Sequence, residues 1–349
     1  MKGGMANPAL TRCRKKRFEW WGPTFEEARK VALSKSKGLK DKRMSLKESV
    51  KKFVRDGANI GIGGFVNTRI PVAAIHEIIR YGVKNLTLSF HSQAYAVDIL
   101  CGAMIIDENN LSIERVELAY EAHEMLGLAP CFRYLVEKGL IELDDYTNYG
   151  MTARFKAAAM GVPFIPVMEE GGTSMETVNR GRMIECPFTG ENVYLLPACH
   201  PTVGLIHVQM ADIYGNCRIF GTLCTCPEIA QASLHTIVTT EVIIPNENVR
   251  RYPNLTEIPW FIVDAVVEQP WGGYPGAVYG FYWYDVEHLR LWIKAGRDFR
   301  KTGKTDALEN YFNRYVFECE TFDDFISKVP YKTLKRLKAL DGNRPIIWD

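Results

Sequence analysis

Residues 56–71 read Asp-Gly-Ala-Asn-Ile-Gly-Ile-Gly-Gly-Phe-Val-Asn-Thr-Arg-Ile-Pro and have the parts of a strand–turn–helix unit. Asn59–Ile62 is a short apolar run that predicts a buried strand, and residues 63–65, Gly-Gly-Phe, follow at its carboxyl end. Pro71 suits the first turn of the next helix, where a missing N–H costs nothing. Adjacent glycines let a backbone approach a ligand closely, and free N–H groups of such a turn favour an anion. The competing interpretation is a tight turn with a packing role only.

The chain on both sides of this unit alternates between apolar runs and helical patterns. Leu86–Phe90 reads as a buried strand and Pro130–Glu137 as a helix, and Met151–Met160 predicts a helix that ends at Gly161. This alternation predicts βαβ units and an α/β fold with a mostly parallel open sheet wrapped by helices. Ligands bind beyond the carboxyl ends of the strands in such sheets, which is where residues 63–65 are placed.

Several further elements can be placed from pattern alone. A capping box at Ser45 and Glu48 predicts a helix start, and Leu140–Leu143 and Phe261–Val267 read as strands. Residues 212–216 form an Asp-Ile-Tyr-Gly-Asn turn, for which ordinary Gly-Asn turn chemistry is a sufficient explanation.

Composition excludes several functional classes. The 349 residues are 47% hydrophobic and 24% charged, with 43 Lys and Arg against 41 Asp and Glu, so the formal net charge is only +2. Such a balance does not point to nucleic acid. No apolar run approaches the roughly 18 residues of a membrane helix, and the start lacks a signal-peptide core, so we expect a cytoplasmic protein without membrane contact.

The nine cysteines predict free thiols rather than a disulfide scaffold. Cys224 and Cys226 form the one close pair, but their spacing is not that of a zinc knuckle and there is no second pair. We therefore expect no metal.

The amino terminus differs from the rest of the chain. Residues 1–43 are basic and poorly periodic, with a cluster of Arg and Lys at 12–17, Trp20-Trp21 that could dock on the body, and a short helix expected over Phe25–Ser34. The sequence therefore predicts an amino-terminal extension over 1–43 and one main domain over 44–349.

The full string of residues 56–71 resembles the amino-terminal signature of class I coenzyme A transferases, with Asp56, Gly57, Gly63-Gly64-Phe65 and Pro71 in matching places. Arg69, where the family usually has glycine, makes it most similar to the A (alpha) subunit of glutaconate CoA-transferase and its relatives. The Asp-x-x-Gly-Asn turn after Ala211 is a second match. The resemblance runs from about Met44 to the carboxyl terminus and implies the fold of that family for 44–349.

The resemblance also implies a mechanism and a partner. In class I transferases a glutamate carboxylate attacks the acyl-CoA thioester, a glutamyl-CoA thioester forms, and the acceptor acid collects the CoA. That glutamate lies in a Ser-Glu-Asn-Gly-type motif, for which residues 190–192 are a poor match here. We therefore expect an A subunit of a hetero-oligomer whose beta subunit supplies the nucleophile. Coenzyme A thioesters and carboxylic acids would be its substrates, with no permanently bound cofactor.

Relatives with the same fold leave two alternatives open. Some open rings of CoA thioesters by hydrolysing carbon–carbon bonds, and others decarboxylate glutaconyl-type CoA thioesters. The ring-opening relatives use an acidic residue just before a Gly-x-x-Pro-x-Phe-Arg stretch, which here is 127–133, so Glu124 corresponds, with Glu121 three residues earlier. A partly desolvated carboxylate at a strand end would have a raised pKa and serve as a base. The competing role for Glu124 is to favour the amino-terminal dipole of the next helix. The other alternative is a purely architectural subunit.

Candidate binding residues gather around the same turn. Gly63, Gly64 and Phe65 would shape the acyl end of the pocket, and the Arg69 guanidinium could clamp a substrate carboxylate bidentately, as suits a dicarboxylic acyl group such as glutaconyl. An ion pair that fixes the turn would explain Arg69 equally well. His91 and Ser92 follow the strand Leu86–Phe90 at the same edge and could donate hydrogen bonds to an acyl oxygen, although loop polarity also explains them.

Overall fold

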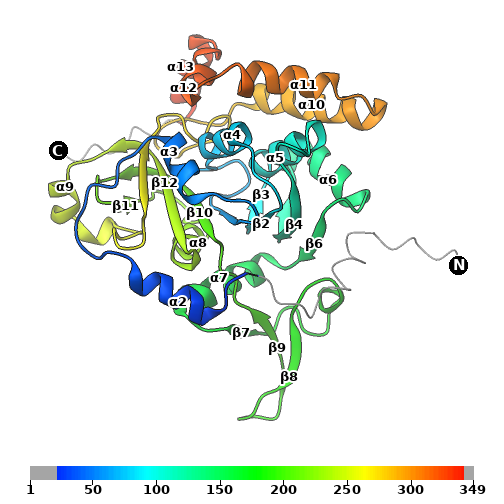
Figure 1. Cartoon of the computed structure of the whole chain (residues 1–349), viewed down its shortest axis with the longest axis vertical. Helices are drawn as coiled ribbons and strands as arrows, with labels where there is room; N and C mark the ends of the chain where they lie inside the picture. Colours follow the sequence, from blue (N-terminus) through cyan, green and yellow to red (C-terminus); the bar gives the residue numbers. More distant parts are fainter. Residues whose placement is uncertain (1–21, 342–349) are drawn as a thin grey trace, which may run out of the picture.

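One mostly parallel sheet organises the computed structural model, which describes residues 22–341 (Figure 1). Each neighbouring pair along its main path is parallel, and the short β11 (Cys217–Arg218) runs antiparallel to β10. The strands of the main path are, in spatial order, β13 (Ala265–Glu268), β12 (His235–Ile243), β10 (Val203–Ala211), β1 (Asn59–Ile62), β2 (Leu86–Phe90), β4 (Ile113–Leu118) and β6 (Glu142–Asp145). The predicted α/β class is confirmed.

Helices cover both faces of the sheet, and each face has its own apolar core (Figure 1). On one face lie α4 (Val72–Tyr81), α5 (Tyr95–Ile106) and α6 (Pro130–Glu137), and on the other α7 (Asn148–Met160) and α8 (Cys226–Ala232). A further helical layer packs on α4–α6 and consists of α10 (Val286–Thr302), α11 (Asp306–Phe312), α12 (Phe322–Ser327) and α13 (Tyr331–Asp341). The remaining α-helices are α2 (Phe25–Ser34), α3 (Leu46–Phe53) and α9 (Asn246–Arg251).

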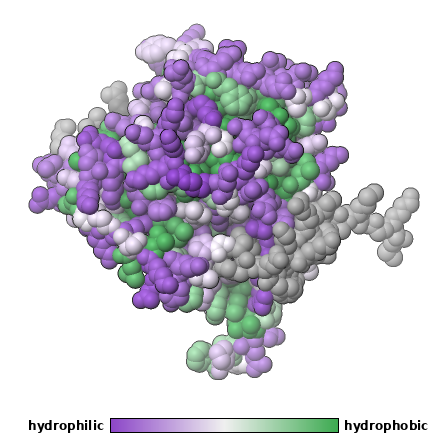
Figure 2. All heavy atoms as spheres, in the orientation of Figure 1, coloured by the Kyte–Doolittle hydropathy of each residue, from purple (hydrophilic) through white to green (hydrophobic). Residues whose placement is uncertain are grey.

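A separate antiparallel sheet projects from the body beyond α7 (Figure 1). Its strands are β7 (Phe164–Val167), β9 (Asn192–Pro197) and β8 (Arg182–Glu185). Hydrophobic side chains are exposed on it, and Figure 2 shows them as green spheres at the lower end of the molecule; Phe188, in the loop between β8 and β9, is 93% exposed. Two-residue strands β3 (Ser92–Gln93) and β5 (Tyr120–Glu121) form a third, parallel pair.

Most predicted elements coincide with observed ones. The strand Leu86–Phe90 and the helix Pro130–Glu137 agree residue for residue, and Ser45 and Glu48 form both hydrogen bonds of the capping box. Gly161 ends α7 with φ +71°, in the left-handed conformation expected there.

Two predicted strands were misplaced. The strand expected over Leu140–Leu143 is Glu142–Asp145, since a buried ion pair to Arg115 satisfies the Glu142 carboxylate and makes a charged strand tolerable. The strand expected over Phe261–Val267 begins only at Ala265, because residues 259–263 are taken up by turn hydrogen bonds.

Residues 35–44 pack along the edge of the sheet at β13. Helix α2 coincides with the expected helix, Lys35 forms an ion pair with Asp264 at 2.7 Å, and the Met44 N–H donates to the Val266 carbonyl. The basic cluster at 12–17 and Trp20-Trp21 lie outside the described residues. Within residues 22–341, all eight cysteines are free, and no helix is long and apolar enough to cross a membrane.

Candidate functional site

A topological switch point lies at the carboxyl end of β1. This strand pairs with β2 on one side and with β10 on the other, and the connections from it and from β10 cover opposite faces of the sheet. Open α/β sheets bind ligands in the crevice at such a point. The turn at residues 63–65 lies there, as the sequence predicts, and the Gly63 N–H donates to the Leu205 carbonyl on β10 at 2.9 Å.

The chain's own packing requires glycine at position 64 and leaves little room for a side chain at position 63. Gly64 has φ +88°, and a Cβ atom there would lie 2.7 Å from the carbonyl oxygens of Thr68 and Arg69. At Gly63 a Cβ atom would lie 2.8 Å from Cδ1 of Ile206. The space beside the two glycines is therefore occupied by atoms of the protein itself rather than left open for a ligand.

The N–H groups of the turn are not free, which corrects the expectation of a ready anion site. The Phe65 N–H donates to the Thr68 carbonyl at 2.9 Å, and the Val66 N–H to the Ser92 carbonyl at 3.0 Å. The Gly64 N–H donates to Sγ of Cys226 at 3.1 Å. Since sulfur is a weak acceptor, the Gly64 N–H is the one that a ligand oxygen could take over at the lowest cost.

Arg69 is buried beneath the turn rather than open at its rim. It is 1% exposed and has φ +51°, and its guanidinium donates to the Thr222 carbonyl and approaches Cys226 Sγ at 3.5 Å. Within residues 22–341 no carboxylate pairs with Arg69, so the alternative role as an ion pair in the turn is wrong. Arg69 instead fixes the loop before α8, and its role as a carboxylate clamp stays a prediction.

His91 and Ser92 lie beside the turn at the end of β2. The His91 ring is half-buried, with its centroid 5.5 Å from that of Phe65, and burial lowers its pKa. Its Nδ1 is buried without a hydrogen-bond partner in the described chain. Ser92 is engaged, because its hydroxyl donates to Asn148 Oδ1 at 2.8 Å. His91 therefore retains the freer polar atom of the two.

The turn forms one wall of a cavity of about 200 Å³. The short 3-10 helix η1 (Glu124–Leu126) forms another wall. The side chains and backbone that line the cavity are those of Phe65, Val66, Asn67, Thr68, His123, Glu124, Met125, Leu126 and Tyr284. We refer to it as the turn cavity. The fold thus brings Phe65 and Glu124 to one site, although they come from segments far apart in the sequence.

Glu124 is exposed, so the expected partial desolvation of this carboxylate is wrong. Its backbone is unusual, with φ +48°, a conformation that non-glycine residues rarely adopt. Such outliers cluster at functional sites, although the outlier itself assigns no role.

The desolvated carboxyl group of this region belongs to Glu121. Both of its oxygens are buried without a hydrogen-bond partner among the described residues, and burial, with Asp98 nearby, raises its pKa well above the usual range. A carboxyl group in these surroundings is held protonated and uncharged. Sequence spacing places Glu121 only three residues from Glu124, and only burial tells the two apart.

A buried histidine joins the turn cavity to the core and was not among the predicted site residues. His123 lines the cavity but is 1% exposed, and its Nε2 lies 3.6 Å from Asp98 Oδ2. Asp98 Oδ1 accepts the N–H groups of Cys131 and Phe132 at the start of α6, and Oδ2 accepts the Trp292 indole N–H at 2.7 Å.

The turn cavity therefore combines apolar walls with a similar share of polar groups, which include Asn67, Thr68 and Tyr284. Phe65, Met125 and Leu126 offer apolar surface, while Glu124 and His123 bring one exposed carboxylate and one buried imidazole. Such a lining accommodates an acyl chain and can orient a carbonyl group, and a single exposed carboxylate is available for proton transfer.

Comparisons with known proteins point to one family. The family model described as Coenzyme A transferase matches residues 43–269. The chain is 31% identical over 319 residues to the A subunit of glutaconate CoA-transferase from Acidaminococcus fermentans, covering 86% of this chain and 96% of that protein. It is 30% identical over 290 residues to the A subunit of 3-oxoadipate CoA-transferase from Pseudomonas knackmussii, covering 82% and 97%.

Solved structures point to the same family. The crystal structure of glutaconate coenzyme A-transferase from Acidaminococcus fermentans superimposes with a TM-score of 0.79 at 30% identity, over 88% of this chain and 98% of that chain. The decarboxylase AibA/AibB superimposes with a TM-score of 0.65 at 28% identity, over 78% and 98%.

Proposed function

Because this chain belongs to the coenzyme A transferase family, we propose that it is the A subunit of a hetero-oligomeric enzyme that moves coenzyme A between carboxylic acids. The observation that carries the proposal is the match to two proteins named as A subunits of such transferases, over almost their whole lengths. Glutaconate and 3-oxoadipate are both dicarboxylates, which favours a dicarboxylic acyl group here as well.

In this proposal the nucleophile is a glutamate of the partner, a beta subunit. Its carboxylate attacks the thioester carbonyl carbon, the bond to sulfur breaks, and the resulting CoA thiolate attacks the glutamyl carbonyl to give a glutamyl-CoA thioester and the free donor acid. An acceptor carboxylate then takes the CoA by the reverse steps. The chain described here offers no better nucleophile at the turn cavity, because Glu124 is exposed and Glu121 is buried with a raised pKa.

The residues of this chain would hold the acyl part of the substrate. Phe65 and Leu126 provide apolar walls. The Gly64 N–H is buried next to Phe65 and held by a weak sulfur acceptor, so an acyl oxygen would reach it only after the contact with Cys226 opens. Arg69 has no carboxylate partner in the described chain, but it is 1% exposed and donates to the Thr222 carbonyl, so a substrate carboxylate would reach it only if that contact were broken. No permanently bound cofactor is part of this proposal.

Exposed apolar surface supports the proposal of a second, partner chain. The projecting sheet exposes Met183 and Ile184 on β8, and the loop between β8 and β9 exposes Phe188. Contiguous apolar patches rimmed by polar residues mark interaction sites. We also propose that residues 44–349 form the main transferase domain and that 1–43 are an extension to it.

A decarboxylase or carbon–carbon hydrolase is the second candidate. It is favoured by Glu124, which lines the same cavity as Phe65 and has a strained backbone, and by the likeness to the decarboxylase AibA/AibB. In that case Glu124 would act as the base or acid on the acyl group.

One experiment separates these functions. The chain would be co-expressed with the product of its neighbouring gene and offered linear and cyclic acyl-CoAs, with and without acceptor acids, while products are followed by mass and free thiol is measured. New acyl-CoA that forms only with an acceptor, without free thiol, would support transfer. An acyl-CoA that gains water or loses carbon dioxide without an acceptor would overturn it in favour of the second candidate.

A further inference from the structure

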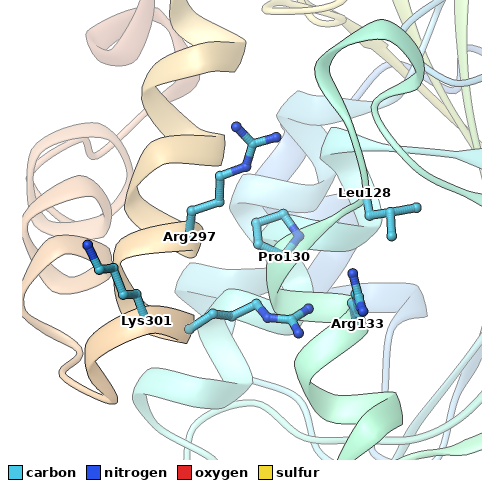
Figure 3. A pocket seen from close by; sticks show the side chains of 6 residues that line it. Leu128, Pro130, Arg133, Arg297 and Lys301 are labelled. Carbon is cyan, nitrogen blue, oxygen red and sulfur yellow. The ribbon is translucent and has the colours of Figure 1, made fainter.

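A second, strongly basic cavity lies behind the segment that borders the turn cavity. It has a volume of about 420 Å³ and is lined by Leu128, Pro130, Arg133, Arg297, Arg300 and Lys301 (Figure 3). Arg297 and Lys301 come from α10, whereas Leu128, Pro130 and Arg133 come from the start of α6 and the loop before it. We refer to it as the basic cavity. We propose that it binds the phosphoryl groups of the nucleotide part of coenzyme A, an inference that rests on the function proposed above.

The charges of the basic cavity are incompletely neutralised. Arg133 and Arg300 both pair with Glu137, at 2.5 and 2.7 Å. Within residues 22–341, Arg297 and Lys301 have no carboxylate partner. Four cationic side chains thus face one carboxylate, and the charges of Arg297, which donates to the Leu126 carbonyl, and of Lys301 are not neutralised by a described carboxylate. Guanidinium groups bind phosphate oxygens bidentately, and a lysine adds a point charge.

The two sides of the basic cavity are held together by specific contacts, so the cavity is not formed by flexible surface side chains alone. The Arg297 guanidinium donates to the Leu126 carbonyl at 2.7 Å, which ties α10 to the segment after η1. Gly296 permits close packing there, because a Cβ atom on it would lie 2.4 Å from Pro130 Cγ. The walls on the two helices are therefore held at a fixed spacing, which lowers the cost of ordering cationic side chains around a ligand.

Position connects the two cavities. Leu126 lines the turn cavity, and its carbonyl is held by Arg297 of the basic cavity. Met125 of the turn cavity and Leu128 of the basic cavity are 82% and 55% exposed, and give apolar surface on which a pantetheine arm or an adenine ring can pack. Coenzyme A has this order of chemistry, with phosphoryl groups at one end, a pantetheine arm, and the thioester at the other.

The test compares ligands that contain and lack phosphoryl groups. Binding of coenzyme A, 3′-dephospho-coenzyme A, pantetheine and inorganic pyrophosphate would be measured by calorimetry with the full chain, alone and with its co-expressed partner. The variants are Arg297→Gln/Lys301→Gln and Lys301→Glu, a charge reversal at an exposed position that leaves the contact of Arg297 with the Leu126 carbonyl intact. Lys332→Gln on α13 is the matched control, because it removes an exposed lysine that does not line the cavity.

We expect both variants to weaken coenzyme A binding by about tenfold or more, and to leave pantetheine binding within about twofold. The loss should shrink at high salt, and the control should match wild type. If wild type and Lys301→Glu bound coenzyme A with equal affinity, the proposal would be overturned. It would also be overturned if pyrophosphate bound as tightly as coenzyme A, because the basic cavity would then be a site for free anions.

Failure of the proposed function would look different. If the enzyme transfers CoA but neither variant changes KM for acyl-CoA relative to an acyl-pantetheine thioester, the function stands and the basic cavity is not the nucleotide site. If no acyl-CoA is turned over, yet coenzyme A binding depends on Arg297 and Lys301, the site stands and the proposed function is wrong.

Discussion

The backbone N–H of Gly64 donates a hydrogen bond to Sγ of Cys226 at 3.1 Å, although 162 residues separate the two positions. This contact links the turn after β1 to the first residue of α8, across the switch point of the sheet. It occupies the N–H that a ligand at the turn would use, with an acceptor weak enough to be replaced.

Gly64→Ala should destabilise the chain by about 2–4 kcal/mol, since it adds both backbone strain and a clash with carbonyl oxygens. Gly57→Ala is the matched control, because Gly57 also has positive φ but a Cβ atom there would meet nothing within 4 Å. The control should cost only about 1 kcal/mol. Denaturant unfolding measures both values, and equal losses would show that close packing at Gly64 adds nothing to the backbone strain.

Arg69→Ala should raise KM for a dicarboxylic substrate by about tenfold to a hundredfold and spare a monocarboxylic one, since the guanidinium would no longer meet the second carboxylate. Arg69→Lys keeps the charge but not the bidentate geometry, so it should restore part of the loss. Steady-state kinetics on both substrates gives the result, and Tm checks the loop held at Thr222. If KM rose equally for both substrates, Arg69 would not bind the second carboxylate, and this role would be dropped from the proposed function.

Glu124→Gln separates the two candidate functions. If the partner supplies the nucleophile, turnover should stay within about threefold of wild type, because the exposed carboxylate takes no part in the chemistry. As a general base in a decarboxylase or hydrolase, its loss should cost about 10²–10⁴-fold in kcat. The exposed Glu108→Gln serves as control, with kcat measured in the assembled complex. A large loss in a confirmed transferase would contradict the role assigned here.

Glu121→Gln should stabilise the protein at neutral pH. The folded chain holds Glu121 protonated because its pKa is raised, whereas the unfolded chain ionises it above about pH 4.5, so its contribution to the free energy of unfolding falls as pH rises through that value. Glutamine keeps the shape and removes this dependence. We expect a gain of up to about 4 kcal/mol at pH 7.5, which is three pH units above 4.5 at about 1.4 kcal/mol each, and almost none at pH 4.5, in thermal unfolding at both pH values. The same gain at both would mean a packing effect rather than protonation.

Local pattern was sufficient for much of the fold. The apolar run Asn59–Ile62, the glycines after it and Pro71 predicted a strand, a turn and a helix start, and each is present. Capping at Ser45 and the left-handed Gly161 were also predictable, because they depend on neighbours within a few residues.

One of the two misplaced strands had a non-local cause. Asp144 and Asp145 lie beyond the predicted strand Leu140–Leu143 but belong to β6, where Arg115 pairs with Glu142 and Arg180 with Asp144. From the sequence alone, burying a charged side chain is expected to cost free energy, because the sequence does not show which distant residue pairs with it.

The candidate site, like the fold, has features that the sequence predicted and features that only the structure showed. The sequence by itself determined the strand–turn–helix unit, the edge of the sheet on which it lies, and the segment that carries Glu124. Only the tertiary structure decided that Glu121 rather than Glu124 is desolvated, that Arg69 is buried, and that Cys226 covers the Gly64 N–H. The physical reason is that burial, pKa and hydrogen-bond partners depend on residues that are distant in the chain, whereas turns, caps and periodicity depend on adjacent ones.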